Sequence, residues 1–121
     1  MIVAGFGFRG AATRASLEQA LAAAGGPPID LLAAPEDKAD AACLTDLAAA
    51  LGLPVCSIDA ATLAAIDTPT QAERVLAARG TGSVAEAAAL AAAGPGATLI
   101  SARRISADRL ATCAIASGDP R

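Results

Sequence analysis

The chain begins with Met1 and continues as Ile2-Val3-Ala4-Gly5-Phe6-Gly7-Phe8-Arg9-Gly10, and this opening segment carries the main prediction about the architecture. Residues 2–7 are β-branched, aromatic or small and apolar, which favours a strand in the interior of a sheet. Residues 5–10 are rich in glycine and predict a turn. The sequence after them favours a helix with Thr13 or Ser16 as its N-cap residue. A strand, a glycine-rich turn and a helix in this order are typical of an α/β protein.

Strands and helices continue to alternate along the rest of the chain. Four more strands are expected, at residues 29–34, 55–58, 97–101 and 109–116. Three more helices are expected: at residues 41–51, at residues 70–80 after the capping-box sequence Thr70-Gln71-Ala72-Glu73, and at residues 83–93. The polar segment 103–108, which begins with Arg103 and Arg104, is expected to be a hairpin turn. We therefore predict a single domain over residues 1–121, α/β and three-layered. Its five-stranded mixed sheet is mostly parallel, ends in a C-terminal antiparallel hairpin and carries helices on both faces.

Composition limits the chemistry that the chain can perform. There is no histidine, which excludes Ser-His and Cys-His nucleophiles, histidine acid–base catalysis and His-containing metal sites. A net charge of −3 and two aromatic residues argue against a nucleic-acid-binding protein. Cys43, Cys56 and Cys113 stand far apart, as is typical of core thiols in the reducing cytoplasm. Charges, Gly and Pro interrupt every apolar stretch before the ~20 residues of a membrane span. We expect a cytoplasmic protein with no cofactor, metal, membrane or nucleic-acid partner.

Ligands of open α/β sheets bind beyond the carboxyl ends of the parallel strands, where three loops of this chain are expected to meet. These loops are residues 5–10, 35–40 and 80–83. The first leaves backbone amides accessible, and Arg9 adds a forked donor that suits a carboxylate or a phosphate. Its Gly-x-Gly spacing resembles the start of a dinucleotide-binding motif. That motif needs an acidic residue after the second strand, where Ala33 and Ala34 stand, so a simple turn is favoured.

The other two loops add further groups that can bind an anion. The second contains Lys38, the only lysine of the chain. In the third, Ser83 and Glu86 are expected to cap a helix. The backbone amides of this loop and the hydroxyls of Thr81 and Ser83 are also expected to form an anion-binding nest. The capping role and the anion-binding role can hold at once. No Gly-Lys-Ser/Thr follows, so this is not a Walker A loop. From the residues alone we predict a cleft that accepts an anion, and the reaction stays open.

Four segments taken together resemble a known family. They are Gly5-Phe6-Gly7-Phe8-Arg9-Gly10, then Lys38 with Asp40, then Gly82-Ser83-Val84-Ala85-Glu86-Ala87-Ala88-Ala89-Leu90, and then Thr112-Cys113-Ala114-Ile115-Ala116. This ordered set resembles the CobE family, which is equivalent to the C-terminal domain of the cobalamin biosynthesis protein CbiG. The resemblance covers nearly the whole chain. It implies a role in the pathway that builds the corrin ring of cobalamin (vitamin B12).

The family resemblance further implies that the chain binds a precorrin or corrinoid intermediate, or hands it on. Precorrins are large apolar rings with acetate and propionate groups, so Arg9, Lys38 and helix amides are expected to bind carboxylates while Phe6 and Phe8 lie against the ring. The negative net charge opposes such a ligand at long range, so recognition must act within a Debye length of ~8 Å. The expected binding residues are Gly5, Phe6, Gly7, Phe8, Arg9, Lys38, Asp40, Thr81, Gly82, Ser83 and Glu86.

Two alternatives remain open beside binding. The first is a hydrolase or ring-modifying enzyme that acts on a precorrin, since two-domain CbiG is associated with opening the ring lactone of cobalt-precorrin-5A. Without histidine, such catalysis would rest on Lys38, Asp40, Glu86 or a bound water. The second alternative is a partner that docks onto another enzyme of the pathway, such as a precorrin methyltransferase. The sequence assigns no catalytic residue.

Overall fold

The computed structural model describes residues 1–25, 27–66, 68 and 83–118. The helix expected at residues 70–80, its capping box, and the candidate binding residues Thr81 and Gly82 lie outside the described residues. Across the part that is described, no helix is both long enough and apolar enough to span a membrane.

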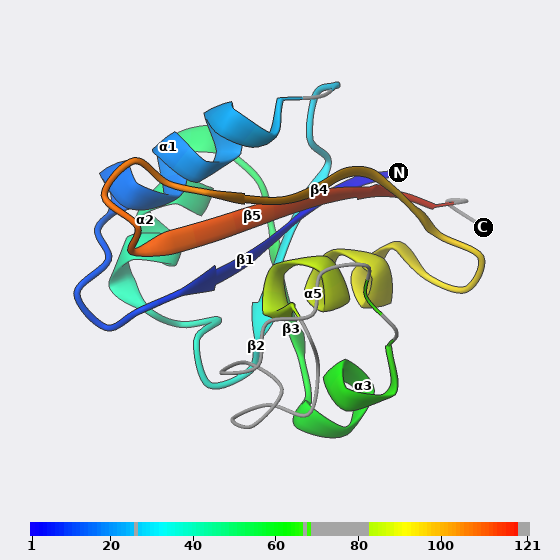
Figure 1. Cartoon of the computed structure of the whole chain (residues 1–121). Coiled ribbons are helices and arrows are strands. Elements are labelled where there is room, and N and C mark those ends of the chain that lie inside the picture. Colours follow the sequence, from blue (N-terminus) through cyan, green and yellow to red (C-terminus); the bar gives the residue numbers. More distant parts are fainter. Residues whose placement is uncertain (26, 67, 69–82, 119–121) are drawn as a thin grey trace.

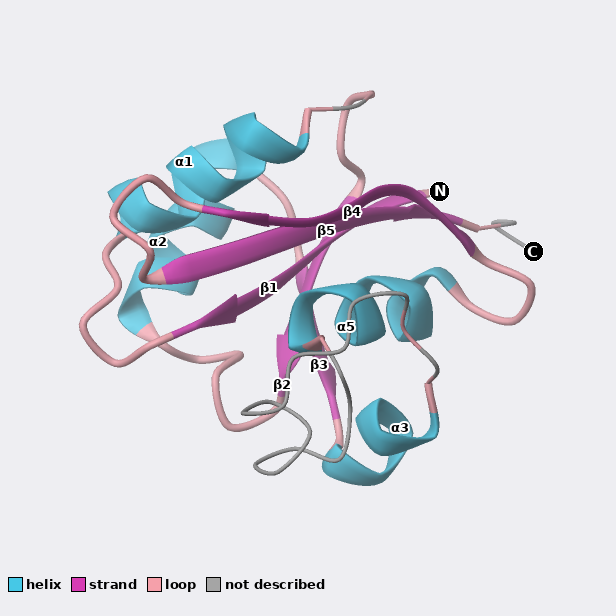
Figure 2. Ribbon diagram, viewed as in Figure 1, coloured by secondary structure: helices cyan, strands magenta, loops and turns pink. Residues whose placement is uncertain are grey.

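Nine elements make up the described part of the fold (Figures 1 and 2). The strands are β1 (Ile2–Phe8), β2 (Leu31–Pro35), β3 (Val55–Ile58), β4 (Thr98–Ile105) and β5 (Ala111–Ser117). The helices are α1 (Arg14–Ala24), α2 (Ala42–Leu51), α3 (Ala60–Ala65) and α5 (Val84–Ala93).

The strands form one five-stranded sheet in the order β3-β2-β1-β5-β4. β1, β2 and β3 pair in parallel, whereas β5 pairs antiparallel with both β1 and β4. The pairing of β1 with β5 extends over the whole strand, from Ile2 opposite Ser117 to Phe8 opposite Ala111. The predicted mixed sheet, with an interior first strand and an antiparallel C-terminal hairpin, is confirmed.

Helices cover both faces of this sheet, as Figure 1 shows. On one face, α1 and α2 contribute Leu17 and Leu47 to a core that contains Phe6 of β1. On the other face, α3 and α5 contribute Leu63 and Ala89 to a core that contains Val3 of β1. Successive residues of a strand point to opposite faces, so β1 serves both cores. The predicted three-layer arrangement is confirmed.

Gly5 and Gly7 lie inside strand β1 and not in a turn, which corrects the expectation for residues 5–10. A Cβ atom at Gly5 would lie 2.2 Å from the carbonyl oxygen of Ala85, and one at Gly7 would lie 3.3 Å from the Cβ of Val84. Both positions therefore face α5, whose backbone comes so close to β1 that Gly5 has no room for a side chain. The turn begins only at Arg9, where the strand ends.

Two further differences concern the ends of elements. β4 continues to Ile105, so Arg103 and Arg104 belong to a strand, and the hairpin turn runs over residues 106–110 with Arg109 at φ 62°. Helix α3 was not expected, because it has only six residues and its N-cap residue, Asp59, makes no side-chain capping hydrogen bond. The N-cap of α1 is Thr13.

Candidate functional site

The carboxyl ends of the parallel strands form one edge of the sheet, and the β4–β5 turn lies at that same edge. The register shows this, because Phe8 at the end of β1 is opposite Ala111 at the start of β5. The backbone N–H of Arg9 donates to the carbonyl of Leu110 at 2.9 Å, which joins the loop after β1 to the hairpin turn. Figure 2 shows these two loops together at the left of the view. The predicted loops after β1 and β2 thus lie at the edge where α/β proteins bind ligands.

Lys38 and Phe8 form the central contact at this edge. The Nζ atom of Lys38 lies 5.5 Å from the centre of the Phe8 ring, which is a cation–π geometry. The loop after β2 holds the lysine in place: the N–H of Lys38 donates to Pro35 at 2.8 Å, and the N–H of Ala41 donates to Lys38 at 3.0 Å. Both Lys38 and Phe8 are half-buried, and the adjoining Arg9 is exposed. The edge therefore places the Lys38 ammonium over an aromatic ring, with the exposed Arg9 next in the chain.

The first turn of α5 reaches the same end of β1 from the opposite face. Val84 lies against Gly7, and Ser83 caps the helix by accepting a hydrogen bond from the N–H of Glu86 at 3.3 Å. The predicted capping role of Ser83 is confirmed. Its hydroxyl is fully buried, so the nest expected around it depends on Thr81 and Gly82, which the structure does not describe.

Three expected binding residues lie beneath the edge and not on it. Gly5 is buried against α5, and the side chain of Phe6 is fully buried in the core under α1 and α2. Glu86 is also fully buried, and its Oε2 atom accepts a hydrogen bond from the N–H of Arg103 at 2.8 Å. In this structure the side chains of Phe6 and Glu86 cannot touch a ligand, because protein covers them. Asp40 is exposed in the loop after β2.

The pattern of charge at this edge was only partly expected. All the basic side chains of the described residues lie in segments at the carboxyl edge: Arg9, Arg14, Lys38, Arg103, Arg104 and Arg109. Of these, the sequence predicts a binding role only for Arg9 and Lys38. Arg103 and Arg104 come to this edge through the pairing of Arg104 with Cys113 of β5, which is itself opposite Phe6 of β1. The short polar segment 103–108 does not indicate the register in which β4 pairs with β5.

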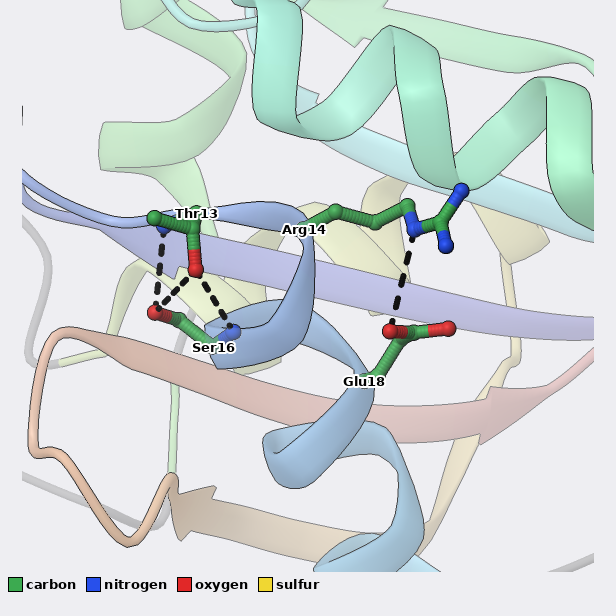
Figure 3. A network of polar contacts seen from close by, with 4 residues as sticks. All are labelled: Thr13, Arg14, Ser16 and Glu18. Carbon is green, nitrogen blue, oxygen red and sulfur yellow. Dashed lines mark hydrogen bonds and ion pairs between the residues drawn. The ribbon is translucent and has the colours of Figure 1, made fainter.

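A network of hydroxyl and carboxylate groups fixes the start of α1 to the β4–β5 turn. Thr13 and Ser16 form a reciprocal capping box, in which each side chain accepts a hydrogen bond from the other residue's N–H, while Arg14 pairs with Glu18 at 3.7 Å (Figure 3). The Ser16 hydroxyl also donates to Asp108 at 2.5 Å, as does the hydroxyl of Ser106. The hydrogen bonds from Ser106 and then Ser16 hold the pKa of the exposed Asp108 below its usual value. These contacts hold the hairpin turn, and with it the loop of Arg9, in one position.

A cavity of about 390 Å³ lies elsewhere, between α3 and the end of α5. The end of α5 is at the amino edge of the sheet, because a Cβ at Gly118 would lie 2.0 Å from the carbonyl oxygen of Ala93, and the N–H of Gly118 donates to Met1. The cavity is therefore separate from the predicted site. Its lining residues are Thr62, Ile66, Leu90, Ala91, Gly94, Pro95, Gly96 and Ala97. Among the described residues, no group of three or more Cys, Asp or Glu is arranged to hold a metal ion.

The solved structures that match this chain include two proteins whose names refer to cobalamin biosynthesis. CobE, described as a protein from the cobalamin (vitamin B12) biosynthetic pathway, is 34% identical with a TM-score of 0.80, over 96% of this chain and 89% of that one. The cobalamin biosynthesis protein chiG from Agrobacterium tumefaciens str. C58 is 36% identical with a TM-score of 0.75, over 98% of this chain and 99% of that one. No curated protein matches the sequence.

Comparison with protein families gives the same result. Residues 2–116 match the family described as Cobalamin synthesis G C-terminus. This match spans nearly the whole chain, as do the two structural matches, and it confirms the resemblance found in the sequence. The chain therefore belongs to the family of the C-terminal domain of cobalamin synthesis protein G, CbiG, and is a protein of cobalamin biosynthesis.

Proposed function

We propose that this domain, residues 1–121, binds a precorrin or corrinoid intermediate of cobalamin biosynthesis at the carboxyl edge of its sheet. The observation that carries the proposal is the position of the Lys38 ammonium 5.5 Å from the centre of the Phe8 ring, with Arg9 next in the chain. A corrinoid ring is apolar on its faces and carries carboxylates around its rim. A cation over an aromatic ring, with an exposed arginine next in the chain, complements both parts of such a ligand.

The proposed contacts are narrower than the set expected from the sequence. Phe8 lies against the ring, Arg9 and Lys38 bind carboxylates, and Asp40 lies beside them in the loop of Lys38. Val84 at the start of α5 lies against Gly7, so the loop expected to bind an anion through Thr81, Gly82 and Ser83 stays part of the proposal. The buried residues that pack beneath this edge are Gly5, Phe6 and Glu86.

The proposal favours binding over hydrolysis for a structural reason. The contact between Lys38 and Phe8 joins a cation to an aromatic face, which serves recognition and brings no nucleophile to a base. Because the site lies on loops at the edge of the sheet, the same surface can hand the bound intermediate on to another enzyme of the pathway. The proposal places the protein in the cytoplasm, where Cys43, Cys56 and Cys113 remain the free thiols that the structure shows.

A spectral titration tests this function directly. The probe is hydrogenobyrinic acid, a metal-free corrin with free carboxylates, and the matched control ligand is its methyl ester. We expect the acid to bind with a shift in its absorption spectrum and the ester to bind more weakly, because the cations lose their partners. Lys38→Ala is expected to weaken binding of the acid about tenfold, the equivalent of one charge-assisted hydrogen bond.

The matched control variant is Arg14→Ala, which removes a cation at the same edge that is already paired with Glu18 at 3.7 Å. Its affinity for the acid should equal that of the wild-type protein. Circular dichroism confirms that each variant is folded. If the folded wild-type protein produces no spectral shift, or if Lys38→Ala binds as tightly as the wild type, the proposed function is wrong.

A further inference from the structure

A buried carboxylate holds the end of β4 in an irregular conformation. The pairing of β4 with β5 shifts register twice, between Leu99 and Ser101 and again between Ser101 and Arg104. Each shift marks a β-bulge, where one residue of the strand loses its place in the ladder and the local twist increases. Arg103 lies within the second bulge, and its N–H donates to Glu86 of α5 at 2.8 Å.

Glu86 is well suited to this role by its position. It lies in the first turn of α5, where the partial positive charge of the helix favours a carboxylate, and it is fully buried. A buried charge is costly unless hydrogen bonds compensate it, so its position in the fold is closely determined. The N–H of Arg103 would otherwise be a donor without its strand partner. The contact therefore connects the helix on one face of β1 to the edge strand two strands away.

The bulge determines where two arginines lie. Arg103 is half-buried and Arg104 is exposed, and both are near the end of β4 that pairs with the start of β5. β4 and β1 are separated by one strand, so the arginines lie about 10 Å from the line of β1, at twice the strand spacing. Among the described residues, neither guanidinium forms an ion pair. The two charges extend the row that begins with Arg9 at the end of β1.

We infer that Arg103 binds a peripheral carboxylate of the corrinoid and that Glu86 is the positioning residue that places it, through its hydrogen bond to the Arg103 N–H. This inference rests on the proposed function and adds a second group of contacts to it. Lys38 and Arg9 would hold one side of the ring at Phe8, and Arg103 would hold carboxylates on the side toward β4. Glu86, which the sequence suggested as a ligand contact, acts instead through the backbone of β4.

The test is a set of affinities for hydrogenobyrinic acid and for its methyl ester. Arg103→Ala should weaken binding of the acid about tenfold, because one charge-assisted hydrogen bond is lost. Its affinity for the ester should not change, and this selective loss separates a ligand contact from a general loss of structure. Glu86→Ala should weaken binding of the acid to the same extent. The double variant should bind within about twofold of Arg103→Ala, because both changes remove one interaction.

Glu86→Gln is the conservative control, because its side-chain carbonyl can still accept the hydrogen bond from the Arg103 N–H. Glu86→Gln should bind the acid as tightly as the wild-type protein and keep the Arg103 amide protected from hydrogen exchange. Glu86→Ala should expose that amide to exchange. If Glu86→Ala does not fold, Glu86→Asp takes its place: it keeps the charge but withdraws the acceptor by one methylene.

The outcomes separate the two proposals. If the wild-type protein does not bind the acid, the proposed function fails and this inference fails with it. If the wild type binds but Arg103→Ala binds equally well, or weakens acid and ester alike, the inference is wrong and the proposed function stands. If Arg103→Ala shows the selective loss of affinity for the acid while Glu86→Ala binds the acid as tightly as the wild type, the positioning role of Glu86 is wrong. That role is also wrong if the double variant binds the acid more weakly than Arg103→Ala by the full effect of Glu86→Ala.

Discussion

The two faces of the sheet are packed in different ways. Under α1 and α2 the core consists of large side chains, among them Phe6, Leu17 and Leu47. Under α5 the helix presents alanines to a strand that presents glycine, and a Cβ at Gly5 would lie 2.9 Å from the Cβ of Ala89. The first face is stabilised mainly by buried apolar area, and the second by the close approach of two backbones.

This difference shows which face positions the first turn of α5. The large side chains of the α1–α2 face can adjust to small changes by repacking. The glycine–alanine contact cannot adjust, and it determines where the first turn of α5, with Ser83 and Glu86, lies relative to the end of β1. The position of the first turn of α5 therefore depends on the face that has the smallest side chains, whereas Phe8 packs against the core under α1 and α2.

The largest effect is expected for Gly5→Ala, which tests the close approach directly. The added methyl group would lie 2.2 Å from the carbonyl oxygen of Ala85, and backbone cannot yield as a flexible side chain does. We expect a loss of more than about 3 kcal/mol in the free energy of unfolding, measured by urea denaturation. The control is Gly10→Ala, where a Cβ would meet nothing within 4 Å. Equal stabilities of the two variants would show that α5 does not approach β1 as described.

Truncations on the two faces should differ in size. Leu17→Ala, in the core under α1, should cost about 3 kcal/mol, because it removes a fully buried side chain and leaves a cavity. Ala88→Gly in α5 should cost about 1 kcal/mol, mainly through lower helix propensity. Both values come from the same denaturation experiment. If Ala88→Gly lowered the free energy of unfolding more than Leu17→Ala did, the α1–α2 face would not be the one stabilised mainly by buried apolar area.

The smallest effect concerns pH and the hairpin turn on the α1 side. Because the pKa of Asp108 is lowered from 3.8 by hydrogen bonds from Ser106 and Ser16, its contribution to stability is complete above that value. The contribution is lost as the pH falls through the lowered pKa. Denaturation of the wild type and of Asp108→Asn should therefore differ at neutral pH and converge in acid. A constant difference between the two proteins across the acidic range would contradict this role of Asp108.

Much of the fold could be predicted because its signals are local. The caps at Thr13 and Ser83, the short apolar strands and the alternation of elements each depend on a few neighbouring residues. The interior position of β1 also followed from its apolar composition. The mixed sheet with its C-terminal hairpin was predicted from the order of these elements.

The features that were missed depend on contacts between distant segments. Gly5 and Gly7 are typical of a turn, and only the later helix α5 explains why they belong to a strand. Phe6 and Phe8 share one face of β1, yet only Phe8 lies where the strand ends and partial exposure begins. Arg103 reached the candidate site through two bulges in β4, which no local pattern of residues 98–105 indicates.

A crystal structure of the protein with hydrogenobyrinic acid tests the central claim most directly. The account predicts that the ring lies against Phe8, with its carboxylates on Arg9, Lys38 and Arg103 at the carboxyl edge of the sheet. A ring bound instead in the cavity between α3 and α5, against Ile66 and Leu90, would contradict it.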